Sequence, residues 1–167
     1  MLSPQQLFDR LAELGIVHAT VEHEAVFTVE QAKQHRGTLP GHHIKNLFLR
    51  NKKEEMWLVV ALEDRAIDLK RLGEVLGAGR LSFGSPERLR TYLGVEPGSV
   101  TPFSVINDTG HKVRLVLDRS LTDGGPINAH PLTNTMTSAI VLPDLLRFFE
   151  ATGHAPRWLD LPADVTI

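Results

Sequence analysis

The chain is organised around residues His43 to Leu62, which read HIKNLFLRNKKEEMWLVVAL. Two apolar runs, residues 44–50 and 56–62, flank the polar residues 51–55, a composition typical of a turn between two strands. Neither run alternates cleanly between apolar and polar side chains. Strands that are apolar on both faces usually lie inside a sheet and are covered on both sides. The stretch therefore predicts a central β-hairpin.

Two polar side chains interrupt the first run of this hairpin. Lys45 and Asn46 must point to opposite faces, because successive side chains of a strand alternate. Lys45 shares its face with Leu47 and Leu49, and a lysine is almost never fully buried unless it is paired. It therefore needs a buried acid or an open cleft, unless it is a strand-end lysine whose stem covers the core while its ammonium reaches water. Spacing alone leaves both interpretations open.

The composition is that of an ordinary globular protein. With 167 residues, 42% of them hydrophobic and 23% charged, the chain is expected to form one domain over residues 1–167. The absence of cysteine excludes a thiol nucleophile, a disulfide framework and a thiolate metal site. A formal net charge of −2 gives no bulk attraction to nucleic acid, so RNA binding must rely on a local basic patch.

No part of the sequence indicates a membrane protein. No apolar run approaches the roughly 20 residues that a membrane-spanning helix requires. The N-terminus has no basic region followed by an apolar core, so we expect no signal peptide and a cytoplasmic location.

Capping residues and periodicity predict the other elements. A capping box at Ser3 opens a helix that ends at Gly15, and Phe27 precedes a second capping box of a short polar helix, a candidate lid, that ends at Gly37. Further helices are expected after Asp68, Ser85 and Pro143, and strands at 16–23, 103–106, 113–117 and 139–141, the middle two joined by the turn at 107–110. Trp158 and Leu159 are expected to dock before the tail frays. The predicted class is α+β, with a mixed, mostly antiparallel, barrel-like sheet surrounded by helices.

The standard catalytic motifs are absent. The sequence has no Gly-x-Ser-x-Gly elbow, no Walker loop and no His-Glu-x-x-His, and its eight histidines lack the spacing of a zinc site. Two Gly/Pro loops look more like parts of a site, namely residues 98–102 and 124–131, the second of which ends in His130-Pro131. His130 is open to two interpretations, a histidine satisfied by backbone before a rigid turn or a functional group.

Three motifs together resemble a known family. They are Lys45 in an Ile-Lys-Asn-Leu-Phe-Leu strand, the Gly98-x-x-x-Pro102-Phe103 loop, and His130-Pro131 followed by Thr-Asn-Thr. In this order they resemble the YbaK/prolyl-tRNA-synthetase-associated editing domain family, over roughly residues 4–158. Asn46 and His130 resemble the freestanding branch that removes alanine mischarged onto proline tRNA. The alternatives are a deacylase of a cysteine or serine ester, or a non-catalytic module that binds aminoacyl or nucleotide ligands.

The resemblance implies a role for each site residue and requires no metal or cofactor. Lys45 would bind phosphate or sugar oxygens of the terminal adenosine, and Asn46 would hydrogen-bond the ester or the attacking water. Backbone near Gly98 would hold the carbonyl or amino group, and His130 would orient the aminoacyl group or cap the pocket. The pocket that excludes proline by size would be lined by Phe27, Ile44 and Pro102.

The implied substrate is the acceptor end of a mischarged proline tRNA. Prolyl-tRNA synthetase or an elongation factor would be a transient partner, and no membrane or DNA contact is implied. The predicted tRNA-binding cations are exposed residues that solvation explains equally well, namely Lys33, Arg36, Lys52 and Arg80, with Arg50, Lys53, Lys70 and Arg71 as further candidates. Arg80 stands out because it follows Gly77-Ala78-Gly79 rather than lying on a helix face.

Overall fold

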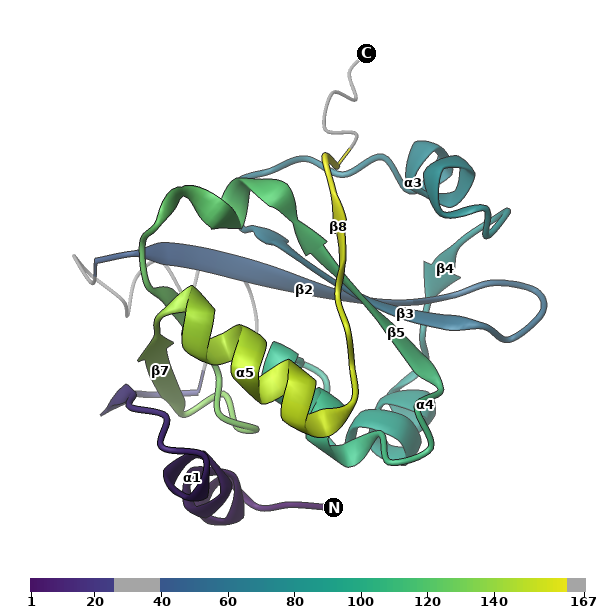
Figure 1. Cartoon of the computed structure of the whole chain (residues 1–167). Helices are drawn as coiled ribbons and strands as arrows, with labels where there is room; N and C mark the ends of the chain where they lie inside the picture. The colour runs from purple at the N-terminus through teal and green to yellow at the C-terminus, as the bar shows by residue number, and fades with distance from the viewer. Residues whose placement is uncertain (26–39, 162–167) are drawn as a thin grey trace.

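The computed structural model describes residues 1–25 and 40–161. The strands are β1 (Ala19–Glu22), β2 (His42–Arg50), β3 (Met56–Leu62), β4 (Ser82–Phe83), β5 (Val113–Asp118), β6 (Ile127–Ala129), β7 (Met136–Ile140) and β8 (Arg157–Leu159). The helices are α1 (Pro4–Glu13), α3 (Leu69–Leu76), α4 (Pro86–Arg88), η1 (Leu89–Leu93), η2 (Pro102–Asn107), η3 (Arg119–Asp123) and α5 (Leu142–Thr152), as Figure 1 shows. The predicted short polar helix, Phe27, Lys33 and Arg36 lie outside the described residues.

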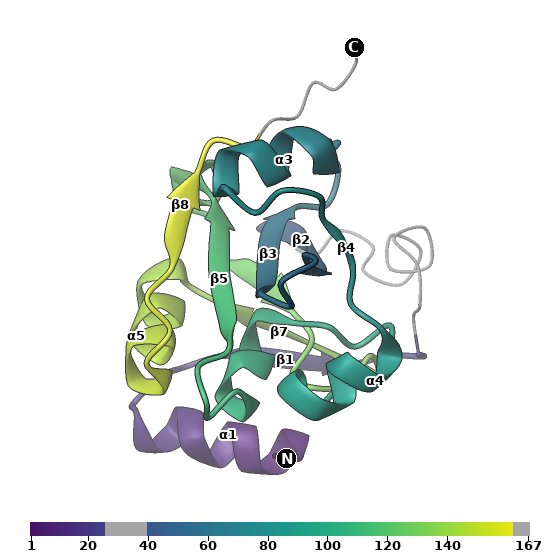
Figure 2. The same cartoon turned by 90° about the vertical axis from the view of Figure 1, so that its right-hand side faces the viewer.

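The predicted hairpin is confirmed and lies at the centre of an eight-stranded sheet. β2 and β3 pair antiparallel from Ile44 opposite Leu62 to Arg50 opposite Met56. The strand path is β1-β7-β6-β2-β3-β5-β8, with β4 also paired to β2. Figure 2 shows that the sheet curves, so that β1 and β7 run across the direction of β5 and β8. The predicted α+β class is therefore confirmed.

The sheet is mixed, with four antiparallel pairings and three parallel ones. The predicted strand at Phe103–Ile106 is wrong, because Pro102 opens a 3-10 helix whose first turn is capped by the Thr101 side chain. β5 therefore has no hairpin partner before it, and it pairs parallel with β3 instead. Trp158 docks as predicted and does so as part of a strand, β8, which pairs parallel with β5.

Alternation along β3 separates two apolar clusters on the two faces of the sheet. Met56, Leu58 and Val60 join the main core, which also takes residues of α1, η2 and α5. Trp57 and Val59 join a second cluster, which is covered by α3. Figure 2 shows α3 on the far side of the sheet from α1. The two faces of β2 therefore have different surroundings, which we call the main-core face and the α3 face.

Side-chain caps begin the helices where the sequence predicts them. Ser3 and Gln6 form both hydrogen bonds of a capping box at α1. Asp68 accepts from two backbone N–H groups at the start of α3, and Ser85 accepts from the N–H of Arg88. Such a cap stabilises a helix by about 1 kcal/mol.

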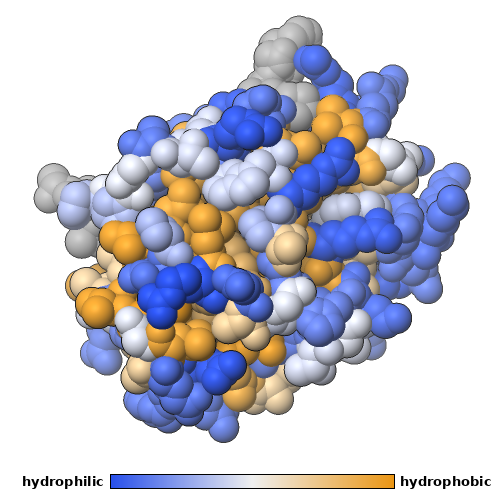
Figure 3. Space-filling view, viewed as in Figure 1, coloured by the Kyte–Doolittle hydropathy of each residue, from blue (hydrophilic) through white to orange (hydrophobic). Residues whose placement is uncertain are grey.

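The surface is mixed in character. Figure 3 shows apolar patches interrupted by hydrophilic side chains, which gather at the right-hand edge over the tip of the β2–β3 hairpin. No helix in the described part of the chain is long and apolar enough to cross a membrane.

Candidate functional site

The edge of β2 that faces away from β3 is covered only in part. β6 pairs with it at His42 and His43, and β4 pairs with it at Leu49 and Arg50. Over residues 1–25 and 40–161, no strand pairs with residues 44–47 along this edge. We call this interval the β2 gap. A ligand that enters at the edge of a strand can reach side chains on both faces of the sheet.

Backbone groups of β2 also point into this gap. The carbonyl of Phe48 accepts from the N–H of Gly84 on the β4 side (2.8 Å), whereas the carbonyl of His43 accepts from the N–H of Glu63 beyond β3 (2.9 Å). These directions alternate along a strand, so the N–H and C=O of Asn46 face the β2 gap. The backbone of Asn46 therefore offers a ligand one hydrogen-bond donor and one acceptor, beside the side chains of Lys45 and Asn46.

Lys45 lies in the β2 gap with its side chain on the α3 face, as its neighbours Leu47 and Leu49 in the second cluster show. Its Nζ donates to the backbone carbonyl of Arg65. Burial lowers the pKa of the Lys45 ammonium, and the nearby charge of Asp64 opposes that shift. The ammonium is thus held in a defined place, with N–H donors that the carbonyl does not use.

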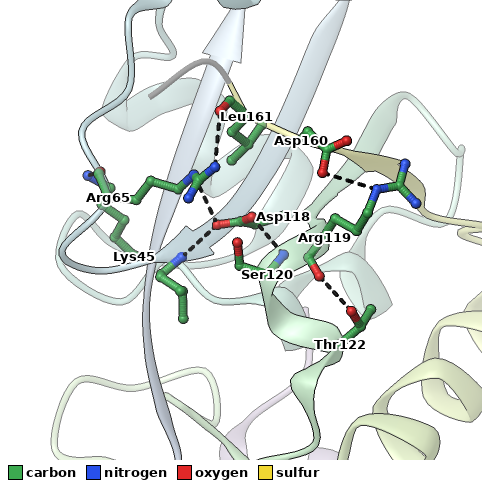
Figure 4. A network of polar contacts seen from close by, with 9 residues as sticks. Lys45, Arg65, Asp118, Arg119, Ser120, Thr122, Asp160 and Leu161 are labelled. Atoms are coloured by element: carbon green, nitrogen blue, oxygen red, sulfur yellow. Dashed lines mark hydrogen bonds and ion pairs between the residues drawn. The ribbon is translucent and has the colours of Figure 1, made fainter. Parts of the chain in front are cut away.

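A buried carboxylate holds the segment that carries this carbonyl. Asp118 is fully buried, and its Oδ2 lies 3.6 Å from Nε of Arg65. The same carboxylate accepts from the backbone N–H groups of Leu62 (3.3 Å) and Ser120 (2.9 Å). The Arg65 guanidinium also donates to the carbonyl of Leu161 (3.2 Å), so this side chain joins the end of β5 to the segment after β8, as Figure 4 shows.

Asn46 points to the main-core face and carries an unsatisfied acceptor. Its side-chain oxygen Oδ1 is buried and has no hydrogen-bond partner in the described structure. Leaving a buried acceptor unpaired costs about 1–3 kcal/mol, so most such groups in native proteins have a partner. The side chain is therefore suited to accept a hydrogen bond from a ligand or from a water molecule.

His130 lies at the rim of the β2 gap. The parallel register pairs His43 with Asn128, and β6 ends one residue before His130. Nδ1 of His130 lies 2.8 Å from the carbonyl oxygen of Met136. Since a carbonyl oxygen only accepts, Nδ1 carries the proton, and in the neutral ring Nε2 keeps its lone pair. The backbone interpretation of His130 therefore holds for Nδ1, and a role of Nε2 toward a ligand stays a prediction.

A second histidine accompanies His130. The ring of His23 lies 6.0 Å from that of His130, and its Nε2 lies 2.8 Å from the hydroxyl of Thr137. Burial lowers the pKa of His130 below the ordinary value of 6.5, the Met136 carbonyl raises it in part, and His23 lowers it further. His130 is therefore held neutral to lower pH than an exposed histidine.

The other predicted pocket residues belong to the main-core face. Ile44 is half-buried and packs against the main core, as does Val100 in the loop between η1 and η2. Gly98 lies in that loop with a φ of 90°, a conformation that favours glycine, and buried Pro102 begins η2. Of the predicted site residues on β2, Lys45 therefore lies on the α3 face, and Ile44 and Asn46 lie on the main-core face.

The predicted RNA-binding cations are dispersed. Lys52 is exposed at the tip of the β2–β3 hairpin, and Arg80 is exposed between α3 and β4. Lys33 and Arg36 fall outside the described residues. In the described ranges, no group of three or more His, Asp or Glu side chains could hold a metal ion.

Sequence reasoning missed three contributors to the site: Arg65, Asp118 and His23. Arg65 and Asp118 are 53 positions apart in the numbering, and no local pattern joins them. His23 stood at the end of a predicted strand, and only the pairing of β1 with β7 brings it to Thr137.

Comparisons with known proteins identify the family to which the chain belongs. Residues 23–148 match the family described as "Aminoacyl-tRNA editing domain". Over 154 residues the chain is 42% identical to "Prolyl-tRNA synthetase associated domain-containing protein 1" of Danio rerio, covering 91% of this chain and 84% of that protein. It is 35% identical over 162 residues to "Prolyl-tRNA editing protein ProX" of Acetoanaerobium sticklandii, covering 96% and 99%.

The fold is shared with a crystal structure described as that of a proposed trans-editing enzyme for prolyl tRNA synthetase. The TM-score is 0.72 at 24% identity, over 96% of this chain and 98% of that one. The family resemblance in the sequence motifs is therefore confirmed. The chain belongs to the aminoacyl-tRNA editing domain family.

Proposed function

We propose that this protein is a trans-editing deacylase that hydrolyses the ester of alanine mischarged onto proline tRNA. The observation that carries the proposal is the β2 gap, where the Lys45 ammonium is held on one face and the unpaired Asn46 oxygen on the other. The aminoacyl end of a tRNA also has two parts, the phosphate and ribose on one side of the ester and the amino acid on the other. Each part would meet one face of the gap.

The reaction requires no nucleophile from the protein. Water attacks the ester carbonyl, the bond to the ribose oxygen breaks, and that oxygen takes up a proton, whereas attack by the vicinal ribose hydroxyl would only move the ester to that hydroxyl. With water the products are alanine and tRNA with its terminal hydroxyl restored. The ester is already activated by the neighbouring hydroxyl and the α-ammonium. Holding it in place and stabilising the developing oxyanion are therefore the protein's main contributions.

Each side chain then has a role in that placement. Lys45 binds phosphate or sugar oxygens of the terminal adenosine. The Asn46 side chain accepts from the α-ammonium or from the attacking water, and its backbone N–H is a candidate donor to the ester oxygen. His130, with its proton on Nδ1, offers Nε2 as an acceptor that orients the aminoacyl group. Backbone near Gly98 completes the pocket on the main-core face.

Selectivity against proline would come from size. An active site built for proline cannot strongly reject alanine, because the missing methylenes are worth only about 1–3 kcal/mol each. A second pocket too small for proline rejects the correct product sterically. Ile44 and Pro102, together with Phe27, are the apolar residues proposed to set that size. The expected setting is the cytoplasm, where prolyl-tRNA synthetase or an elongation factor could hand over the mischarged tRNA.

The test is a deacylation panel. Proline tRNA charged in turn with alanine, serine, cysteine and proline is incubated with the protein, and the remaining ester is followed over time. We expect rapid loss of the alanine ester and little loss of the proline ester. Preferred cleavage of serine or cysteine would assign a different substrate to the same site. Binding without cleavage of any ester would make the protein a non-catalytic module.

A further inference from the structure

We propose that the ring of Phe83, together with Arg80 of the segment before β4 and Lys70 of α3, is a stacking platform for an unpaired nucleotide next to the 3′ end of the bound RNA. This surface, which we call the β4 platform, lies outside the β2 gap. The inference deepens the proposed function, because the RNA whose end enters the gap must leave it over one of the two strands that border it.

Phe83 is unusual among the apolar side chains of this protein. It is 61% exposed, and it is the one aromatic residue among the large hydrophobic side chains exposed in the described ranges. It stands on β4, directly opposite Leu49 of β2. Cross-strand partners project to the same face of a sheet, so Phe83 shares the α3 face with Leu49 and Lys45.

The platform lies within a short reach of the β2 gap. Leu49 is four residues beyond Lys45, or about 13 Å along an extended strand. A nucleotide chain held at Lys45 therefore reaches the ring by running along β2 on the α3 face. The aminoacyl group would occupy the other face, where Asn46 lies. The two faces of β2 thus separate the RNA from the amino acid.

The position of β4 is fixed by a close approach to β2. The N–H of Gly84 donates to the carbonyl of Phe48 (2.8 Å), and a Cβ at Gly84 would lie 2.5 Å from the ring of Phe48. Only glycine allows this contact without a shift of the strand. Phe83 is thereby held exposed at the border of the gap, although its own side chain is not packed into the core.

Two cations that form no ion pair in the described part of the chain lie on α3 and in the segment that leads to β4. Lys70, Glu74, Gly79, Arg80 and Leu81 line a cavity of about 500 Å³ between α3 and the segment before β4. Neither Lys70 nor Arg80 forms an ion pair in residues 1–25 and 40–161. Two cations therefore outnumber the single carboxylate of Glu74 in this cavity.

This combination fits single-stranded RNA better than a protein partner. Single-stranded RNA is bound by an aromatic face for the base and by cations for the flanking phosphates. With a protein partner, an exposed ring of this kind would usually be the centre of a larger apolar patch. Here the cavity beside it carries two cations, which complement phosphate charge.

The experiment uses two uncharged RNA hairpins, so it does not depend on ester hydrolysis. One has an unpaired 3′ end with 2-aminopurine next to its last nucleotides, and the other has the same stem with a blunt end. Affinities are measured for the wild-type protein, Phe83→Leu and Phe83→Trp. Val17→Ala is the matched control, since Val17 is a highly exposed apolar residue at another place. Thermal melting checks that each variant is folded.

We expect Phe83→Leu to weaken binding of the tailed hairpin about five- to 150-fold, the effect of losing one stacked base. Fluorescence quenching of 2-aminopurine should disappear with it, Phe83→Trp should retain both signals, and Val17→Ala should match the wild type. Arg80→Ala should reduce the slope of log affinity against log salt by about 0.7. Binding of the blunt hairpin should be the same in all variants.

Two results would overturn the inference. In the first, Phe83→Leu binds the tailed hairpin as tightly as the wild type does. In the second, it has an equally reduced affinity for both hairpins. These failures are separate from failure of the proposed function. If the wild type cleaves alanyl-tRNA but Phe83→Leu binds normally, only the platform is wrong. If no ester is cleaved but tailed RNA binds in a Phe83-dependent way, the platform stands and the deacylase proposal fails.

Discussion

The buried carboxylate of Asp118 lies 3.6 Å from Nε of Arg65, and the backbone carbonyl of Arg65 accepts a hydrogen bond from Lys45. This relationship connects the interior of the sheet to the ammonium in the β2 gap. Asp118 also accepts from two backbone N–H groups, so it fixes the end of β3 and the start of η3 at the same time.

Replacing Asp118 should therefore destabilise the protein. Asp118→Ala leaves two backbone N–H groups without their acceptor and Arg65 without its ion-pair partner, and we expect a loss of about 1–3 kcal/mol in the free energy of unfolding. Urea denaturation measures it. Asp160→Ala is the matched control, because Asp160 is an exposed partner of Arg119 and such pairs contribute little. Equal effects of the two substitutions would contradict the network described here.

Lys45→Met should reduce deacylation of alanyl-tRNA at least tenfold without loss of stability. The substitution keeps an apolar stem over the second cluster and removes a charge whose burial is unfavourable, as its lowered pKa indicates. Thermal midpoint and single-turnover rate are measured on the same preparation. A large drop in the midpoint with an unchanged rate per folded molecule would make Lys45 a structural residue.

The pH dependence of kcat/KM should reflect the protonation of His130. Burial lowers the pKa of this ring below 6.5, so as pH falls the ring gains its second proton later than an exposed histidine would. If the Nε2 lone pair orients the substrate, kcat/KM should fall at acid pH with a midpoint below 6.5, and His130→Gln should remove this limb. An acid limb unchanged in His130→Gln would assign it to another group.

Linkage gives the same histidine a signature in stability. In the unfolded chain His130 takes up its proton near pH 6.5, and in the folded chain only at lower pH. The stabilisation of the folded state by the neutral His130 ring is therefore fully present above pH 6.5. It is lost as pH falls through the lowered value. Urea denaturation over this pH range measures the effect. We expect the difference in unfolding free energy between the wild type and His130→Gln to narrow as the pH falls.

Ile44→Val and Ile44→Ala should relax the size limit of the pocket. Removing methylenes next to the β2 gap leaves space while Lys45 and Asn46 stay in place. Activity on alanyl-tRNA should stay within about tenfold of the wild type, and activity on a bulkier ester should rise. Loss of alanine activity with no gain elsewhere would show that selectivity comes from specific contacts or from the tRNA.

The hairpin, the helix caps and the resemblance could be predicted because they rest on local patterns. The polar run at 51–55 and the two apolar arms fix β2 and β3, and Ser3, Asp68 and Ser85 mark helix starts. The parallel pairing of β5 with β3 could not be read in this way, because nothing near Val113 in the sequence identifies a strand 57 positions away.

The site shows the same limit. Strand alternation and the motifs predict Lys45, Asn46 and His130 as candidate site residues. The β2 gap itself depends on where β4 and β6 end along β2, a property of tertiary packing. At Phe103 a local pattern gave a wrong prediction. The apolar run favoured a strand, but Thr101 and Pro102 begin a 3-10 helix there.

The central claim is that the β2 gap is where alanyl-tRNA is cleaved, and Asn46→Ala tests it most directly. The Oδ1 atom that this substitution removes is buried and unpaired, so the folded protein should keep its stability. With excess protein, we measure the rate of alanine release from alanyl-tRNA and of proline release from prolyl-tRNA. The account predicts that the wild type releases alanine at least tenfold faster than proline, and that Asn46→Ala lowers the alanine rate at least tenfold at an unchanged thermal midpoint. A folded Asn46→Ala variant that cleaves alanyl-tRNA at the wild-type rate would contradict it.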